Sequence, residues 1–231
     1  MPSPDVASLR RLVDEIFAEQ PPLHRGETET TRPIAPEESS LPAAEVRRLM
    51  AAPPVCWGVS VEVGRRLLEV VRPGWRTLET GAGLTTLVFA LAGASHTAVT
   101  PNGHEAAAIK KYARSKGIAM RGVRFAIAAS EDYLPRAQKT PLDLACIDGK
   151  HAFPWPVLDW FYAADRLRRD GVLVLDDCAL PGVALLKGFL DGDRGWEAEA
   201  RLDGDKTVFY RKRCDSLRDV AWHMQWLPDA K

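Results

Sequence analysis

The chain has 231 residues, which is enough for one large domain with an appendage and too few for two full domains. Hydrophobic residues make up 46% of the chain and charged residues 27%, as is ordinary for a soluble globular protein. The 31 basic residues balance the 31 acidic ones, and this zero net charge argues against a general binder of nucleic acids or anionic membranes.

The N-terminal residues 1–57 are predicted to form a cap segment in front of the main domain. Residues 5–19 carry a helical pattern of apolar positions. Residues 20–42 are dense in Pro, Thr, Ser and Glu, which predicts an extended connector or a mobile cover, and a short helix is expected around 43–51.

The main domain, residues 58–231, alternates helices with short apolar strands. Five strands are predicted at 76–80, 96–100, 123–129, 142–147 and 171–176. Helices are predicted at 59–71, from about Leu84, at 103–116, from Glu131 and at 155–168. Two further strands, 196–202 and 206–212, flank Asp203-Gly204, the composition of a tight hairpin. The pattern predicts a Rossmann-like α/β fold, with a seven-stranded, mostly parallel sheet, helices on both faces and a C-terminal antiparallel hairpin.

The cysteines and the first residues of the chain bear on its location. The sequence contains four cysteines: Cys56, Cys146, Cys178 and Cys214. They show neither a C-x-x-C pair nor a spacing typical of zinc ligands. Charges stand where a signal peptide would need its apolar stretch, and no run approaches about 18 apolar residues. We therefore expect a reduced, cytoplasmic protein without a membrane segment.

The segment TLETGAGLTT, residues 77–86, contains a glycine-rich turn between a predicted strand and a helix. Gly81 and Gly83 stand where the chain must turn sharply and where a ligand must approach without meeting a Cβ. The N–H groups of the following helix would point at that ligand. Glu79 is placed to accept hydrogen bonds from a cationic amino group. Many such glycines serve the turn alone, so a steric role stays open beside cofactor binding.

The residues of this turn, Glu79-Thr80-Gly81-Ala82-Gly83, resemble the acidic-x-Gly-x-Gly signature of class I S-adenosylmethionine-dependent methyltransferases. Thr85 occupies the position where that family often has a third glycine. The resemblance implies that all of these residues contact S-adenosylmethionine. The C-terminal hairpin is a feature of the same family and is not typical of dinucleotide-binding Rossmann domains.

The end of the second strand departs from that family, which usually carries there an acidic residue that holds the ribose hydroxyls. The position falls on Thr100, with Asn102 and Glu105 beyond it. A hydroxyl or an amide bonds ribose more weakly than a carboxylate does. After the third strand, the resemblance makes Ser130 and Glu131 the candidate adenine contacts. The negative charge of Glu131 would equally suit the start of a helix.

Acidic residues end two strands that are expected to be neighbours. Asp148 follows the strand 142–147, and Asp176 and Asp177 end the strand 171–176. Ligands bind at the carboxyl ends of the strands in open α/β sheets, so we expect these carboxylates to converge. Carboxylates that converge without Lys or Arg neighbours repel, and magnesium is the simplest counter-charge. Acids at strand ends also serve loops or a cofactor's amino acid moiety, which stays open as the alternative.

His151 is the candidate catalytic base, together with Asp148, because imidazole titrates near neutral pH and a methyl-accepting hydroxyl must lose a proton. A bound metal would lower the pKa of that hydroxyl. The alternative is that His151 only caps the following helix or binds a carboxylate. The other four histidines are expected at the surface: His24, His96, His104 and His223.

The arrangement IDGKH…VLDD resembles a subgroup of small-molecule O-methyltransferases, including sugar-directed ones, and more distantly the catechol O-methyltransferase group. In those relatives the matching acids hold magnesium. The resemblance therefore implies Asp148, Asp176 and Asp177 as magnesium ligands, with Asp148 also close to the cofactor.

Two further patterns concern the acceptor and a competing activity. Trp57 and Trp155 flank the predicted site and are candidates for the wall of an acceptor pocket, with core packing as the alternative. Tyr112 and Lys116 match the Tyr-x-x-x-Lys pattern of short-chain dehydrogenases. Their helix lies in the wrong part of the chain for that chemistry, so we interpret the match as chance.

The sequence favours an enzyme that transfers a methyl group from S-adenosylmethionine to a hydroxyl of a small metabolite, with magnesium as a candidate cofactor. We expect a small-molecule acceptor and no nucleic-acid or membrane partner, and a homodimer is compatible with the sequence. One alternative is a regulatory or scaffold protein that binds the cofactor without methyl transfer, as the substitution at Thr100 suggests. Another is a nicotinamide-dependent oxidoreductase, against which the hairpin and the acidic first turn argue.

Overall fold

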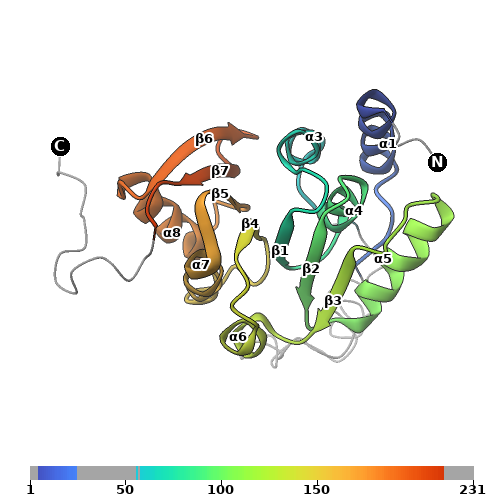
Figure 1. Ribbon diagram of the computed structural model, residues 1–231. Coiled ribbons are helices and arrows are strands. Elements are labelled where there is room, and N and C mark those ends of the chain that lie inside the picture. The colour runs from blue at the N-terminus through green and yellow to red at the C-terminus, as the bar shows by residue number, and fades with distance from the viewer. Residues whose placement is uncertain (1–4, 25–55, 57, 216–231) are drawn as a thin grey trace, which may run out of the picture.

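The computed structural model describes residues 5–24, 56 and 58–215, and within them seven strands form one sheet in the order β3-β2-β1-β4-β5-β7-β6 (Figure 1). The strands are β1 (Arg76–Thr80), β2 (Ser95–Thr100), β3 (Val123–Ile127), β4 (Leu142–Ile147), β5 (Leu167–Leu175), β6 (Trp196–Leu202) and β7 (Thr207–Lys212). β1 to β5 run parallel, whereas β7 is antiparallel to both β5 and β6. The predicted mostly parallel sheet with its C-terminal hairpin is confirmed.

Helices cover both faces of this sheet. One face carries α1 (Val6–Glu19), α3 (Val61–Val70), α4 (Leu84–Leu91) and α5 (Gly103–Ser115). The other carries α6 (Ser130–Tyr133), the short 3-10 helix η2 (Leu134–Arg136), α7 (Trp155–Arg166) and α8 (Pro181–Gly192). The central strands therefore have no solvent-facing side, which explains why their sequences are apolar at consecutive positions.

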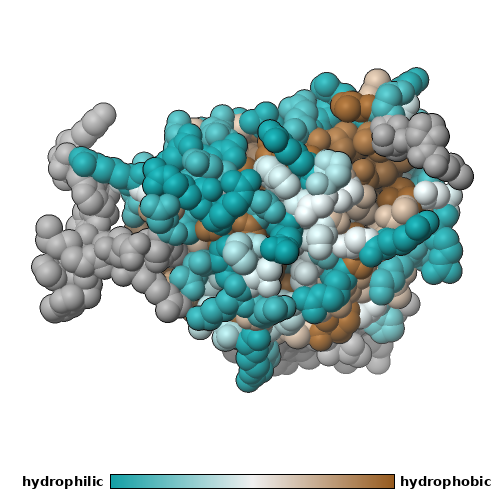
Figure 2. Space-filling model, viewed as in Figure 1, coloured by the Kyte–Doolittle hydropathy of each residue, from teal (hydrophilic) through white to brown (hydrophobic). Residues whose placement is uncertain are grey.

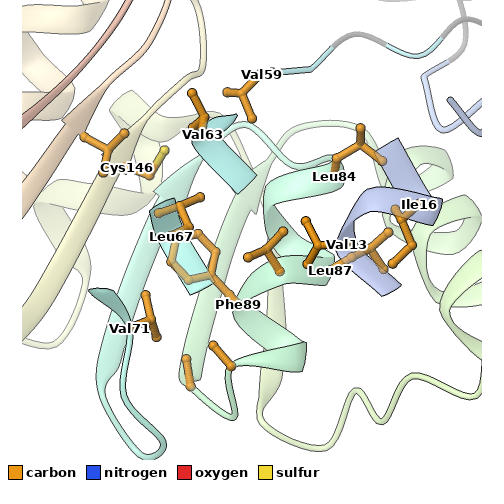
Figure 3. Packing of buried hydrophobic residues seen from close by; sticks show 14 of the residues in the cluster. Val13, Ile16, Val59, Val63, Leu67, Val71, Leu84, Leu87, Phe89 and Cys146 are labelled. Carbon is orange, nitrogen blue, oxygen red and sulfur yellow. The ribbon is translucent and has the colours of Figure 1, made fainter. Parts of the chain in front are cut away.

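The alternation of side chains along each strand divides the core into two clusters. In β4, Cys146 faces the cluster under α1, α3 and α4, whereas its neighbours Ala145 and Ile147 face the cluster under α7 and α8. Figure 3 shows the first of these clusters, in which Phe89 of α4 and Leu67 of α3 pack toward the sheet. Both faces of β4 are thus buried, and only the end of the strand is left for a site.

Helix α1 belongs to the first cluster, although the sequence predicted a separate cap segment. Val13 and Ile16 have no exposed surface. A Cβ added to Gly64 of α3 would lie 2.7 Å from the ring of Phe17, so α3 needs a glycine there to let α1 approach. The division into a cap and a main domain stays a prediction. Outside the described residues lie the part of the predicted connector beyond His24, the predicted helix at 43–51, and Trp57.

The Tyr-x-x-x-Lys pattern joins two helices. Tyr112 donates a hydrogen bond from its hydroxyl to Glu19 over 2.6 Å, and Lys116 forms an ion pair with the same carboxylate. Both residues lie on the α5 side and hold the end of α1. Their spacing therefore has a structural purpose in this protein.

Two elements differ from the predicted ones. β5 begins at Leu167, four residues before the predicted strand, because an irregularity in its pairing with β4 lets the polar residues 168–170 join the strand. Helix α8 was not predicted, since Pro181, Gly182 and Gly188 are typical of a loop. α8 starts close to the ends of β4 and β5, so it bears directly on the site.

The surface is mostly hydrophilic on the face drawn in Figure 2, where hydrophobic residues gather in the region of α1 and α4. None of the helices in the described residues is both long and apolar enough to cross a membrane.

Candidate functional site

The glycine-rich turn leaves β1 and enters α4 where the sequence predicted it. Gly81 has φ of 88°, a region that favours glycine. A Cβ added to it would lie 2.2 Å from the carbonyl oxygen of Asp148, and Asp148 donates a backbone hydrogen bond to Thr80 over 3.1 Å. Gly81 therefore allows the end of β1 to approach the segment after β4, and this close approach fixes the position of Asp148.

The carboxylate of Glu79 faces the protein interior. It is 1% exposed and accepts hydrogen bonds from the hydroxyls of Thr85, over 2.6 Å, and of Thr86. Nε2 of His96 lies 3.1 Å from it, and Nδ1 of His96 lies 2.8 Å from the hydroxyl of Thr77. These contacts tie β1 to the first turn of α4 and to β2. Glu79 and Thr85 thereby shape the turn; their direct contact with a ligand stays a prediction.

Two of the histidines predicted at the surface are buried, so that prediction was wrong for them. His96 is 1% exposed because its ring lies among partners from β1, and His24 is 8% exposed. Nε2 of His24 lies 3.0 Å from the carbonyl oxygen of Ala82, so the chain after α1 closes over the glycine turn. His104 is exposed as predicted, and His223 lies outside the described residues.

Thr80, the second residue of the signature, is buried beside an acid that the sequence did not suggest. Asp159 of α7 is 1% exposed, and burial raises the pKa of its carboxyl. A Cβ added to Gly149 would lie 3.1 Å from the Thr80 hydroxyl oxygen and 3.4 Å from Oδ2 of Asp159. Polar groups of β1, α7 and the segment after β4 thus gather beneath the turn.

The end of β2 is occupied by capping interactions. The buried hydroxyl of Thr100 donates to Oε2 of Glu105 over 3.0 Å and accepts from the backbone N–H of Asn102 over 3.1 Å. Oδ1 of Asn102 accepts from the backbone N–H groups of His104 and Glu105 as the N-cap of α5. The half-buried Glu105 therefore brings a carboxylate to the place where the resemblance led us to expect an acid.

The predicted adenine contacts lie at the start of α6. Ser130 is buried, whereas Glu131 is exposed and accepts a hydrogen bond from the indole of Trp155 over 2.8 Å. Nζ of Lys150 lies 3.3 Å from the centre of the Trp155 ring. Burial raises the pKa of Glu131, but hydrogen bonds from its own N–H and from Trp155, with the charge of Lys150, bring it below the ordinary value. Trp155 thus joins the segment after β4 to α6.

A histidine and two carboxylates meet at the ends of β4 and β5. Asp148, His151 and Asp177 each offer one possible ligand atom, and these atoms lie within 4.8 Å of one another. Nε2 of His151 is 3.1 Å from Oδ2 of Asp177. Their side chains are 30% and 29% exposed, so the pair is accessible to a substrate. The structure brings Asp148 and Asp177 together as predicted.

Asp176 does not join this group. It is 2% exposed and accepts a hydrogen bond from the hydroxyl of Thr207 on β7. Neighbouring residues of an extended chain point in opposite directions, and Asp177 turns further with φ of 54°. The expectation that the acids lack a basic neighbour was wrong, because Nζ of Lys206 lies 3.3 Å from Oδ1 of Asp177.

Burial and mutual repulsion raise the pKa values of two of these acids. For Asp148 burial contributes most, followed by the charges of Asp176 and Asp177, and the pKa is well above its ordinary value. For Asp176 burial again dominates, while the Thr207 hydroxyl and the charge of Lys206 oppose it. The ionised carboxylates therefore cost the folded protein stability.

Replacing Asp148 with asparagine is expected to stabilise the protein at neutral pH. Because its pKa is raised in the folded state, the stability linked to this group is full below the ordinary value of 3.8 and is lost as the pH rises through the raised value. Asp148→Asn removes that loss, so we expect a melting temperature higher by roughly 2–8 °C at about pH 7.5, or about 1–2 kcal/mol. The gain should shrink toward about pH 4.

Differential scanning calorimetry at several pH values measures this effect. The exposed Asp132→Asn serves as the control and should change the free energy of unfolding by less than about 0.5 kcal/mol. An unchanged or lower melting temperature of Asp148→Asn at neutral pH would show that the carboxylate does not destabilise the folded protein.

The comparisons with known proteins agree with this architecture. Residues 78–178 match the family described as a methyltransferase domain. No curated protein matches the chain in sequence.

Three solved structures show how widely the fold is shared. The O-methyltransferase TomG from Streptomyces achromogenes, involved in tomaymycin synthesis and in complex with SAM, is 19% identical, with a TM-score of 0.59 over 69% of this chain and 83% of that one. The O-methyltransferase from Bacillus cereus in complex with SAH is 15% identical, with a TM-score of 0.58 over 92% and 93%. An rRNA methylase from Streptococcus thermophilus is 16% identical, with a TM-score of 0.51 over 66% and 95%. Such identities establish a shared fold.

Proposed function

We propose that the chain is a class I S-adenosylmethionine-dependent methyltransferase, as the match of residues 78–178 to a methyltransferase domain supports, and that it methylates a hydroxyl group of a small molecule at the His151–Asp177 pair. The observation that carries the proposal is this accessible pair, 3.1 Å apart, at the carboxyl ends of the central strands. An imidazole held by a carboxylate is suited to take a proton from a hydroxyl, because the carboxylate stabilises the imidazolium that forms.

The residues around the turn fit the cofactor. The N-terminus of α4 offers backbone N–H groups for a carboxylate, and Glu105 in the first turn of α5, beside the end of β2, offers oxygens for ribose hydroxyls. Ser130 and Glu131 at the start of α6 remain the candidates for adenine. When bound, S-adenosylmethionine supplies a methyl group that is already activated on its sulfonium. The protein must therefore position the acceptor and remove its proton.

The geometry supports a separate role for each ring nitrogen of His151. Nε2 faces Oδ2 of Asp177, so we place the proton of the neutral ring on Nε2, where it is donated to that carboxylate. This leaves Nδ1 as the base for the acceptor hydroxyl. Asp148 lies within 4.8 Å of both groups. Lys206 balances part of the charge of Asp177.

A magnesium-assisted form of the reaction is the second candidate, supported by the ligand atoms of Asp148, His151 and Asp177. Two observations weigh against it. One of the three donors is a nitrogen, whereas magnesium prefers oxygen ligands. The ammonium of Lys206 already supplies positive charge, and Asp176, the remaining predicted ligand, is bonded to Thr207. The residues fit a base better than they fit magnesium.

Removal of divalent metals is therefore expected to leave the rate of methyl transfer within roughly twofold, since a Lewis acid is not needed for the proton transfer. The measurement compares kcat after treatment with excess EDTA with kcat after magnesium is restored. A loss of about 100-fold or more that magnesium reverses would establish the metal-assisted form instead.

Three measurements separate the candidate functions. Binding of S-adenosylhomocysteine is measured by calorimetry, methyl transfer is measured with a panel of hydroxylated acceptors, and thermal stabilisation is measured with NAD. Binding with product formation supports the proposal. Binding without any product favours the regulatory or scaffold protein, and stabilisation by NAD without binding of S-adenosylhomocysteine favours the oxidoreductase.

A further inference from the structure

An apolar groove opens beside the proposed base. It lies between the segment after β4 and the start of α8 and has a volume of about 430 Å³, within the usual range for small-ligand sites. Besides His151, its lining consists of Ala152, Phe153, Leu180, Pro181, Gly182 and Leu185. His151 belongs both to this lining and to the pair with Asp177, so the groove is continuous with the proposed reaction site.

Exposed apolar side chains are concentrated in this groove. In the described part of the chain six large apolar side chains are exposed, and three of them line the groove. Phe153 is 63% exposed, Leu180 41% and Leu185 62%. Apolar surface gathered in one place on a soluble protein indicates a binding site.

The two walls of the groove are held at a fixed spacing. A Cβ added to Gly182 would lie 2.3 Å from the carbonyl oxygen of His151 and 2.8 Å from the backbone nitrogen of Phe153. The start of α8 therefore packs directly on the segment that carries the base. A ligand enters a preformed site, which limits the entropy lost on binding.

The chemistry of the lining selects the ligand. His151 provides the one polar side chain among the lining residues, so a sugar would lose its hydrogen bonds to water without replacement. A nucleic acid would require lysines or arginines, which the lining lacks. An aromatic or polycyclic skeleton would bury its apolar surface against Phe153 and Leu185 instead.

We propose that this groove binds the apolar ring skeleton of the methyl acceptor and that the acceptor is an aromatic or polycyclic molecule with its reactive hydroxyl at His151. The inference rests on the proposed function and specifies its substrate class. It departs from the resemblance to sugar-directed enzymes, since among the described lining residues only His151 offers a sugar a polar side chain.

The test uses the full chain saturated with S-adenosylhomocysteine, with 2-naphthol as the apolar probe and methyl β-D-glucoside as the sugar probe. We expect 2-naphthol to bind at least about tenfold more tightly than the glucoside. Leu185→Gln keeps the length of an exposed side chain and should weaken 2-naphthol binding about tenfold, with the affinity for S-adenosylhomocysteine unchanged. The control is Val6→Gln on α1, which changes a 73% exposed side chain outside the groove and should leave the affinity for 2-naphthol unchanged.

Several results would overturn the inference. The glucoside binding as tightly as 2-naphthol would exclude the substrate class, and unchanged 2-naphthol binding by both Leu185→Gln and Leu180→Gln would exclude the groove. If Leu185→Gln turns a dimer into a monomer without affecting 2-naphthol, the groove is an interface between copies of the chain. If the unaltered protein binds no S-adenosylhomocysteine, the proposed function itself fails, and that result is distinct from failure of the probes alone.

Discussion

Replacing His151 with alanine is expected to lower kcat by about 10²–10⁴-fold, because the substitution removes the group proposed to take the proton of the acceptor. The affinity for S-adenosylhomocysteine should not change, since His151 is not among the residues proposed to hold the cofactor. Steady-state kinetics and calorimetry on the same preparation measure the two quantities.

The pH profile distinguishes a base from a residue that only supports the structure. The rate of the unaltered protein should depend on pH through the proposed base, and His151→Ala should remove that dependence. His104→Ala, which changes an exposed histidine, is the control and should keep the profile. If His151→Ala retains its kcat within about threefold, another group must take the proton.

Replacing Gly81 with alanine is expected to cause the largest loss of stability. The left-handed conformation at φ of 88° costs a residue with a Cβ about 1–2 kcal/mol. The Cβ would also lie 2.2 Å from the carbonyl oxygen of Asp148, and relief of such an overlap by backbone shifts costs about 1–3 kcal/mol more. We expect a loss of about 2–5 kcal/mol in the free energy of unfolding and weaker binding of S-adenosylhomocysteine.

Gly74 offers a matched control for this substitution. Its φ is 81°, close to that of Gly81, but a Cβ added there would meet nothing within 4 Å. Gly74→Ala should therefore show the conformational cost alone, about 1–2 kcal/mol, and leave cofactor binding unchanged. Denaturant unfolding gives both values. Equal losses for the two variants would show that the contact with Asp148 contributes nothing.

The sequence predicted the sheet well because its elements follow from local patterns. β1 and β4 have the predicted bounds, and the hairpin forms around Asp203-Gly204. In these segments consecutive apolar residues or alternation with turn residues leave few other solutions. The elements that were missed, α8 and the start of β5, contain glycines or charged residues whose conformation depends on packing.

The candidate site was predicted less completely because its geometry depends on distant residues. Asp176 and Asp177 are adjacent, and which one faces the site is decided by Thr207, thirty-one positions beyond Asp176. Lys206 comes from the same hairpin. The burial of His96 likewise follows from the register that sets β1 beside β2. Local sequence patterns do not indicate these contacts between residues far apart in the chain.

The strand order at the C-terminal side has a consequence for synthesis of the protein. β7 is the last strand of the sheet to be translated, yet it lies between β5 and β6, and the turn before it carries Lys206. A nascent chain that has not yet exposed residue 206 holds the carboxylate of Asp177 without its ammonium partner. We therefore expect the candidate site to be completed only after the hairpin has left the ribosome, so a product truncated before β7 should lack the ion pair between Lys206 and Asp177.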